Sequence, residues 1–326
     1  MERSTMKKSF KTSQIITIGI VCGLLLLATL FAGCTSSAPA QPVTHAESTT
    51  AVPATTVPGL QSTPQAISTT AAPGVLATTS TPEPVYTYSE GNVIAYTAAS
   101  LKGVSSKLAE GFSKMYPGHK ITFNLDGTQA LTTQIENGAY ADVFISASPK
   151  YTTELTKGGY FQAGTVSTLT TNYVIVILPA DNPANIRTLA DLAKPGVKIA
   201  RAAKTVPVGI ATDAALANLA KSTYGQAWNN SVNTNTVTYE TSEPAVATKV
   251  ALGEVDAGFV YESTATAAKP GTYVSVTIPK NDNYLQVYSI AVLKESTSKG
   301  AAADFENFML SGAGQQILKD YGFRSA

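Results

Sequence analysis

From residue 92 onward, short apolar runs alternate with segments whose apolar residues recur at helical spacing. Short apolar runs bounded by turn residues are typical of buried strands, and apolar residues three or four positions apart are typical of helices. The first such helix begins at Ser100, and we expect it to end before Pro117 and Gly118, which interrupt helices. Its predicted buried stripe consists of Val104, Leu108, Phe112 and Met115.

The same pattern predicts the other elements of this region. Strands are predicted at residues 93–96, 121–125, 142–146, 173–178, 197–200, 236–239, 258–261, 273–278 and 287–293. Further helices are predicted at residues 128–136, 208–221 and 244–252, with one or two more within 301–321. Strand–helix alternation at this spacing predicts an α/β fold, with parallel sheets covered by helices on both faces.

Four of the predicted strand-to-helix loops carry small, hydroxyl or glycine residues. They are residues 97–100, 126–128, 205–209 and 241–243. In open α/β sheets ligands bind beyond the carboxyl ends of the strands, and helix N-termini attract anions through free N–H groups. Ser100 and Thr128 also suit ordinary helix caps, an alternative that the pattern leaves open. The pattern alone thus indicates an anion-binding α/β protein.

The N-terminal region has the features of a secretory signal. Arg3, Lys7, Lys8 and Lys11 precede an apolar run at residues 15–32, and Gly33 and Cys34 follow it. Small residues directly before a cysteine resemble the lipobox of lipoproteins. The resemblance implies that residues 1–34 form a signal peptide with lipobox and that Cys34 becomes the lipidated first residue of the mature chain. The alternative is an uncleaved transmembrane helix. Both alternatives place the rest of the chain outside the cytoplasm.

Residues 35–91 consist mostly of Thr, Ser, Ala and Pro, with scattered Val and Gln. Such a segment buries too little apolar surface to offset its ordering entropy, so we expect a disordered tether. The whole chain has a formal net charge of +1 and only 14% charged residues, which argues against nucleic-acid binding. No cysteine follows Cys34, which excludes disulfides, thiolate zinc sites and a cysteine nucleophile from the folded part.

Motifs of common enzyme classes are absent from the sequence. It contains no HExxH, GxSxG or P-loop pattern, so we expect neither catalytic residues nor a cofactor. A ferric site would need several tyrosinate, histidine or carboxylate ligands, and only Tyr261 and Glu243 are candidates.

Five segments, in order, resemble the molybdate-binding proteins of ABC importers. These segments are Thr97-Ala98-Ala99-Ser100-Leu101, residues 127–147, Val206-Pro207-Val208-Gly209, residues 253–261, and residues 314–323. The resemblance covers residues 92–323 and implies a two-lobed periplasmic-binding-protein fold of type II. In that fold two crossing strands join the lobes, and the ligand lies in the cleft between them.

Carried over to this chain, the resemblance implies lobe one at residues 92–172 plus 265–326 and lobe two at 173–264. It also implies a site for a tetrahedral oxyanion without any cation. Ser100 and Thr128 would contribute hydroxyls from lobe one. The N–H groups of Val208 and Glu243 and the Tyr261 hydroxyl would come from lobe two. A buried dianion needs many hydrogen bonds, which neutral donors at fixed positions can supply.

Glu243 departs from many members of the family, which have an apolar residue there. A tungstate- and molybdate-binding branch has a carboxylate that bonds the metal directly, paired with an aspartate at the position of Val206. Because that aspartate is missing, we expect the Glu243 side chain to turn to solvent, with direct ligation of molybdenum or tungsten as the alternative. Thr128 and Val208 replace the more usual serine and alanine and keep the hydroxyl and the N–H.

The expected function is therefore extracytoplasmic capture of molybdate or tungstate and delivery to an ABC permease and its ATPase. We expect a monomer that binds no nucleic acid. The alternatives are a binding protein for sulfate or phosphate, an extracytoplasmic enzyme, or a sensor or adhesin.

Overall fold

The computed structural model describes residues 91–326. The predictions for the signal, Cys34 and the tether fall almost wholly outside these residues. The first elements are β1 (Asn92–Ala98), η1 (Ala99–Leu101), α1 (Ser105–Met115), β2 (Lys120–Asp126), α2 (Thr128–Glu136), β3 (Val143–Ser146), α3 (Pro149–Lys157) and β4 (Ser167–Pro179). The next are η2 (Leu189–Ala193), β5 (Ile199–Ala202), α4 (Pro207–Leu219), η3 (Ala220–Tyr224), α5 (Gly225–Asn235) and β6 (Thr236–Glu240). The last are α6 (Glu243–Ala251), β7 (Ala257–Tyr261), α7 (Glu262–Ala267), β8 (Tyr273–Thr277), β9 (Leu285–Val292), α8 (Lys299–Leu310) and α9 (Gly312–Asp320).

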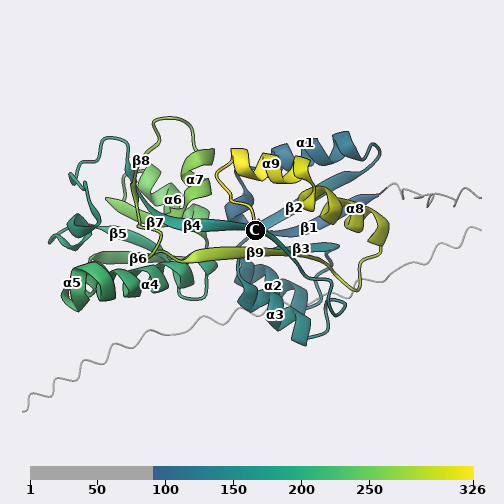
Figure 1. Ribbon diagram of the computed structural model, residues 1–326, viewed down its shortest axis with the longest axis horizontal. Helices are drawn as coiled ribbons and strands as arrows, with labels where there is room; N and C mark the ends of the chain where they lie inside the picture. The colour runs from purple at the N-terminus through teal and green to yellow at the C-terminus, as the bar shows by residue number, and fades with distance from the viewer. Residues whose placement is uncertain (1–90) are drawn as a thin grey trace, which may run out of the picture. The chain divides into compact units, whose positions relative to one another are not determined.

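The strands form two sheets that share the long strand β4. Sheet A has the order β2-β1-β3-β9-β4, and sheet B has the order β4-β7-β5-β6 with β8 also paired to β4. Residues 167–173 of β4 pair with β9, and residues 174–179 pair with β7 and β8. The chain thus passes from sheet A into sheet B along β4 and returns from β8 into β9 (Figure 1).

The two-lobed α/β architecture is confirmed, but its sheets are mixed rather than parallel. β1 runs parallel to β2 and β3, and β5 runs parallel to β6 and β7. β4 and β9 are antiparallel to their neighbours because they carry the chain between the sheets in opposite directions. Helices α1, α8 and α9 cover one face of sheet A and α2 and α3 the other (Figure 1).

The lobe limits predicted from the sequence stay a prediction. Strand pairing places β8 beside residues 175–179 of β4, in sheet B. The predicted limit at residue 264 would assign β8 to the first lobe. This strand pairing favours a second lobe that extends past residue 264, to the connection between β8 and β9.

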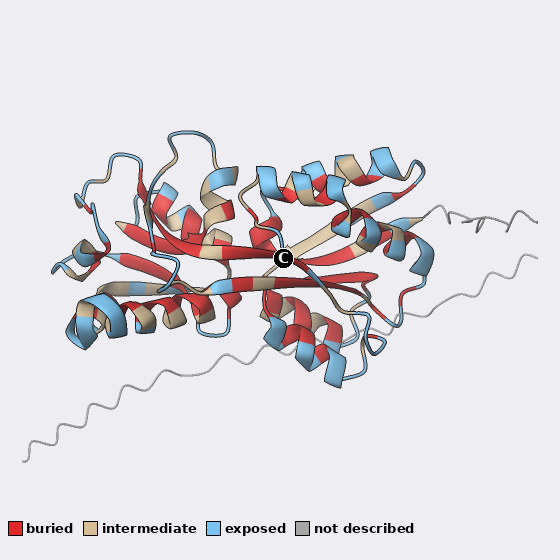
Figure 2. Cartoon of the chain, in the orientation of Figure 1, coloured by how far each residue is buried: buried red, intermediate tan, exposed pale blue. Residues whose placement is uncertain are grey.

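The core lies along the central strands, whose residues are mostly buried (Figure 2). Every residue of β3 and of β7 is buried, as expected for strands covered on both faces. The stripe predicted for the first helix is buried at Val104, Leu108 and Phe112, but Met115 is 44% exposed. Met115 is the last residue of α1, where the helix ends. That part of the prediction is wrong.

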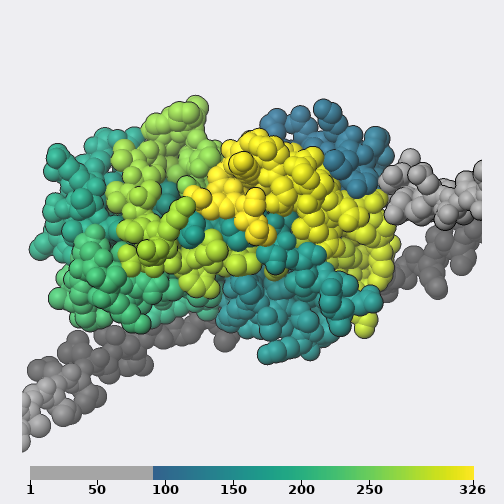
Figure 3. Space-filling model, viewed as in Figure 1, coloured from purple at the N-terminus to yellow at the C-terminus, as the bar shows by residue number. Residues whose placement is uncertain are grey.

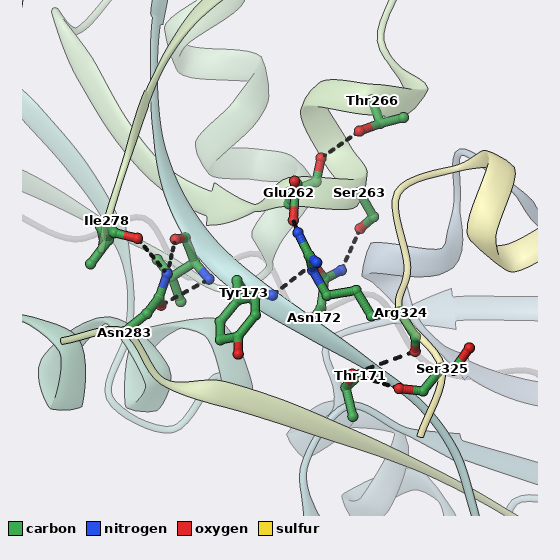
Figure 4. A network of polar contacts seen from close by, with 11 residues as sticks. Thr171, Asn172, Tyr173, Glu262, Ser263, Thr266, Ile278, Asn283, Arg324 and Ser325 are labelled. Atoms are coloured by element: carbon green, nitrogen blue, oxygen red, sulfur yellow. Dashed lines mark hydrogen bonds and ion pairs between the residues drawn. The ribbon is translucent and has the colours of Figure 1, made fainter. Parts of the chain in front are cut away.

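The C-terminal residues lie along β4. The backbone of Arg324 pairs with Thr171 in both directions at 2.9 Å. The Arg324 guanidinium forms an ion pair with Glu262 at 2.6 Å and lies over the ring of Tyr173 (Figure 4). Figure 3 shows this C-terminal segment, coloured yellow, at the surface of the face in view. The end of the chain therefore braces the strand that joins the two sheets.

Candidate anion-binding site

The five residues predicted to bind the ligand all line one small cavity. Its empty space is about 210 Å³, counted with the solvent at its mouth. The remaining lining residues are Ala98, Ala99, Gly127, Ala147, Val206 and Pro207. Four of the predicted residues follow strands β1, β2, β5 and β6, and Tyr261 is the last residue of β7. The cavity therefore lies at the carboxyl ends of strands, as the sequence pattern predicts.

Three helices begin at this cavity without a side-chain cap. The N-caps of α2, α4 and α6 are Gly127, Val206 and Ser242, and none of these three described residues makes a side-chain cap bond. Helices α3 and α9 are capped by the hydroxyls of Ser148 and Ser311, whereas α1, α5, α7 and α8 also lack a side-chain cap bond but their first residues do not line the cavity. The first N–H groups of a helix have no partner within it. The cavity therefore collects free N–H groups and the positive ends of helix dipoles.

The two hydroxyl residues from sheet A are held by fixed neighbours. Ser100 lies in η1, and its Oγ is 2.9 Å from the Tyr288 hydroxyl. Thr128 is the first residue of α2, and its Oγ1 accepts a hydrogen bond from the Ala147 N–H at 3.2 Å. Because Thr128 accepts in this contact, its own proton is free to be donated to a ligand.

Glu243 is buried at the cavity, so the expectation that its side chain turns to solvent is wrong. The residue is only 4% exposed, and its Oε1 accepts hydrogen bonds from the Tyr261 N–H and the Thr264 hydroxyl. Its Oε2 is buried without a hydrogen-bond partner among the described residues. Burial raises the pKa of Glu243 to about 7, against the smaller opposing effect of the two hydrogen bonds.

The Tyr261 hydroxyl is hydrogen-bonded to a neighbouring side chain. It donates to Gln286 Oε1 at 3.2 Å, and burial raises the pKa of this phenol well above its usual value. The Tyr261 side chain therefore meets a ligand as a neutral phenol. A ligand would have to compete with Gln286 for its single proton.

No lysine, arginine or histidine is among the described residues that line the cavity. Within residues 91–326 no group of three or more histidine, cysteine, aspartate or glutamate side chains could hold a metal ion. Val206, which stands where direct ligation would require an aspartate paired with Glu243, is buried and lines the cavity. The site therefore offers neutral donors and one buried carboxyl group, a set that suits an anion better than a bare cation.

Two hydrogen bonds join the sheet A side of the cavity to the sheet B side. Gln129 in α2 donates to the Thr241 carbonyl at 2.8 Å, just before α6. The Tyr151 hydroxyl in α3 donates to the Thr205 carbonyl, just before α4. Both contacts hold the loops around the cavity together.

Comparisons with known proteins identify the family. The family model for bacterial extracellular solute-binding proteins matches residues 93–324. The chain belongs to this family. Molybdate-binding protein ModA of Mycobacterium tuberculosis is 33% identical over 233 residues, which cover 71% of this chain and 84% of that protein.

Solved structures agree with this assignment. The periplasmic molybdate-binding protein of Azotobacter vinelandii has a TM-score of 0.63 at 25% identity, covering 72% of this chain and 99% of that one. The substrate-binding domain of a putative molybdenum ABC transporter from Clostridium difficile has a TM-score of 0.56 at 29% identity, with 72% and 99% covered. The resemblance noted in the sequence is thereby confirmed. As a solute-binding protein, the chain is not an enzyme, and its relatives indicate no cofactor.

The solute-binding fold also brings in residues that the sequence did not single out. Tyr288 and Gln286 from β9 lie behind the Ser100 and Tyr261 hydroxyls, and Thr264 from α7 bonds Glu243. Tyr288 and Gln286 are two residues apart on a strand and therefore share one face, but nothing in the sequence relates that face to the loops.

Ser100→Ala is expected to weaken oxyanion binding at least tenfold. A hydrogen bond to a charged group is worth roughly 1.5–3 kcal/mol, which the substituted protein would lose on binding. In the protein without ligand, the substitution removes only the hydrogen bond between Ser100 and Tyr288. Titration calorimetry measures the affinity. Ser105→Ala is the matched control, because that hydroxyl bonds the Lys102 carbonyl on the surface. Unchanged affinity with reduced stability of the empty protein would make Ser100 a structural residue.

Proposed function

We propose that this solute-binding protein captures molybdate or tungstate outside the cytoplasm and delivers it to an ABC permease and its ATPase. The observation that supports this most strongly is the convergence of three helix N-termini without side-chain caps and three hydroxyl residues on one cavity, whose described lining includes no lysine, arginine or histidine. We further propose attachment to the membrane through a lipid on Cys34 or through an uncleaved N-terminal helix. Within residues 91–326 no helix is long and apolar enough to span a bilayer.

The donor set explains both capture and release. A buried dianion is costly unless many hydrogen bonds replace its water shell. The proposed donors come from both sheets: Ser100 and Thr128 on one side, and the N–H groups of Val208 and Glu243 on the other. The Tyr261 hydroxyl joins them when it leaves Gln286. Every donor is neutral, and the donors of one side move away from those of the other when the cleft opens. Release therefore requires no separation of an ion pair.

Sulfate and phosphate are the competing ligands, and size separates them from molybdate. The cavity is lined by residues at three helix starts, and the Gln129 and Tyr151 hydrogen bonds hold the loops before α6 and α4. Donors held in this way cannot follow the oxygens of a smaller ion. We therefore expect selection of the larger oxyanions.

Molybdate or tungstate is expected to raise the thermal stability of the purified protein. A ligand that binds only the folded state adds about 2.7 kcal/mol at a hundredfold excess over its dissociation constant. Differential scanning calorimetry with molybdate, tungstate, sulfate and phosphate measures the effect. Equal shifts with sulfate and molybdate would refute the proposed specificity, and a shift with phosphate alone would reassign the ligand.

A further inference from the structure

An ion in the anion cavity can leave only when the two sides of the cleft part. The five residues predicted to bind it are between 1% and 9% exposed, so the cavity has no wide opening to solvent. Two of these residues come from the sheet A side and three from the sheet B side. Any contact that joins the two sides across the cavity therefore opposes release of the ligand.

Two hydrogen bonds join the sides at the loops before α6 and α4. Gln129 Nε2 donates to the Thr241 carbonyl at 2.8 Å, and the Tyr151 hydroxyl donates to the Thr205 carbonyl. In both cases a helix that starts at the cavity begins two residues after the carbonyl. Neither bond involves β4 or β9, the strands that connect the two sheets. Both bonds can therefore break when the sides part, without the loss of a strand pair.

The donors of these two bonds belong to segments that also line the cavity on the sheet A side. Gln129 directly follows the ligand donor Thr128 in the first turn of α2. Tyr151 lies in the first turn of α3, and Ala147, just before this helix, lines the cavity and donates its N–H to Thr128. Each bond thus ties a segment with ligand donors on one side to a helix start with ligand donors on the other.

The Gln129 amide is placed so that its bond holds the sides without locking them. A Cβ on Gly127 would lie 2.4 Å from Gln129 Nε2, so the amide reaches Thr241 through space that a side chain on Gly127 would fill. Gln129 Oε1 is buried without a hydrogen-bond partner among the described residues. A buried oxygen without a partner costs free energy, which is regained when the cleft opens and water reaches it. This cost offsets part of the hydrogen bond to Thr241.

We propose that Gln129 and Tyr151 form a latch across the cleft that sets how long the protein retains its oxyanion. Neither residue is among those that line the cavity, so both are positioning residues. They act by holding the starts of α6 and α4, with the N–H groups of Glu243 and Val208, against the sheet A side. This inference rests on the proposed function of the cavity.

Release of radiolabelled molybdate from the purified protein into excess unlabelled molybdate, followed by rapid filtration, tests the latch. Gln129→Ala and Tyr151→Phe each remove one donor. Each is expected to raise the dissociation rate about fivefold, the effect of one neutral hydrogen bond. The double variant should show the product of the two increases, because the bonds join different loops.

The association rate separates a latch from other roles. It follows from the dissociation rate and the calorimetric affinity, and it should change less than twofold in all three variants, because the latch forms only after the ligand has entered. A purely structural role of Gln129 or Tyr151 would instead lower the melting temperature of the empty protein and leave the dissociation rate unchanged.

The matched controls remove the same kinds of donor within one side of the cleft. Tyr273→Phe removes a hydroxyl that bonds the Ala247 carbonyl at 2.9 Å on the sheet B side. Gln315→Ala removes an amide that bonds the Leu169 and Met309 carbonyls at 3.0 and 2.9 Å on the sheet A side. Neither change is expected to alter the dissociation rate.

Unchanged dissociation rates in both single variants would overturn the latch, and so would slower association with unchanged dissociation. Binding of sulfate or phosphate but not of molybdate by the wild-type protein would contradict the proposed function instead. In that case the same release measurement is made with the labelled anion that binds. Faster release from the two variants would support the latch, and equal release would overturn it.

Discussion

At pH 8 the Glu243→Gln protein is expected to be more stable than the wild type by about 3 kcal/mol in the absence of ligand, and at pH 4.5 the two should be nearly equal. The pKa of the folded protein's carboxyl is about 7, against 4.5 for the ordinary group. Between these values the unfolded chain releases the proton and the folded chain keeps it, so stability falls as pH rises and the loss is complete above pH 7. The glutamine has no such loss. Urea unfolding at several pH values measures the difference.

The same substitution should strengthen oxyanion binding at pH 8 by at least tenfold. Like charges about 4 Å apart repel by several kcal/mol even at an effective dielectric of 20, and the ionised Oε2 has no partner that offsets this. The protonated carboxyl, like the glutamine amide, can donate to the anion. Wild-type affinity should therefore fall as pH rises from 6 to 8, whereas Glu243→Gln should show little change.

Glu254→Gln is the control for both measurements, because that exposed carboxylate pairs with Lys249 away from the cavity. If Glu243→Gln instead loses affinity tenfold, and loses more for tungstate than for molybdate, the carboxylate is in direct contact with the metal centre. That result would restore the alternative suggested by the tungstate-binding branch.

Gly209→Ala is expected to weaken binding at least tenfold and to destabilise the protein by about 1–3 kcal/mol. A Cβ at this position would lie 2.1 Å from the Ala203 carbonyl oxygen and 2.7 Å from that of Ala202. Because both obstacles are backbone atoms, the start of α4 would have to move. The N–H of Val208 would then leave the cavity.

Gly312→Ala is the matched control, since a Cβ there meets nothing within 4 Å at the start of α9. It should leave affinity unchanged and stability equal or slightly higher. Unchanged affinity in Gly209→Ala would show that the start of α4 does not need its present position to bind the ligand.

The elements that the sequence predicted are those in which local pattern and burial agree. The predicted helix 128–136 matches α2, and the predicted strand 258–261 lies within β7. The sequence pattern missed three helices, and in each case the reason is local. α3 and α5 are rich in Thr, Lys and Asn with few apolar residues, and α7 has only six residues. The register and direction of β4 and β9 depend on pairing with strands far away in the chain, which periodicity does not report.

The candidate site was predicted from loop position and resemblance, and its surroundings were not. Thr128 and Val208 lie in the first turns of α2 and α4, as the sequence predicts. The helix predicted to open at Ser100 begins at Ser105 instead, and Ser100 lies in η1. The orientation of Glu243 depends on Thr264 and on the depth at which α6 begins, both of which are tertiary properties. The contact between Tyr288 and Ser100 joins residues 188 positions apart. No local pattern encodes such a contact.

The place of β9 in sheet A has a consequence for the order in which the chain can fold. β9 lies between β3 and β4 in the sheet, yet it is the last strand in the sequence. A nascent chain that already contains β1 to β4 lacks the strand that joins them, and pairings between distant segments form slowly. We expect sheet A to remain incomplete until synthesis has passed residue 292. Until that point β3 and β4 lack the strand that pairs with both of them, so this part of the chain cannot complete its fold.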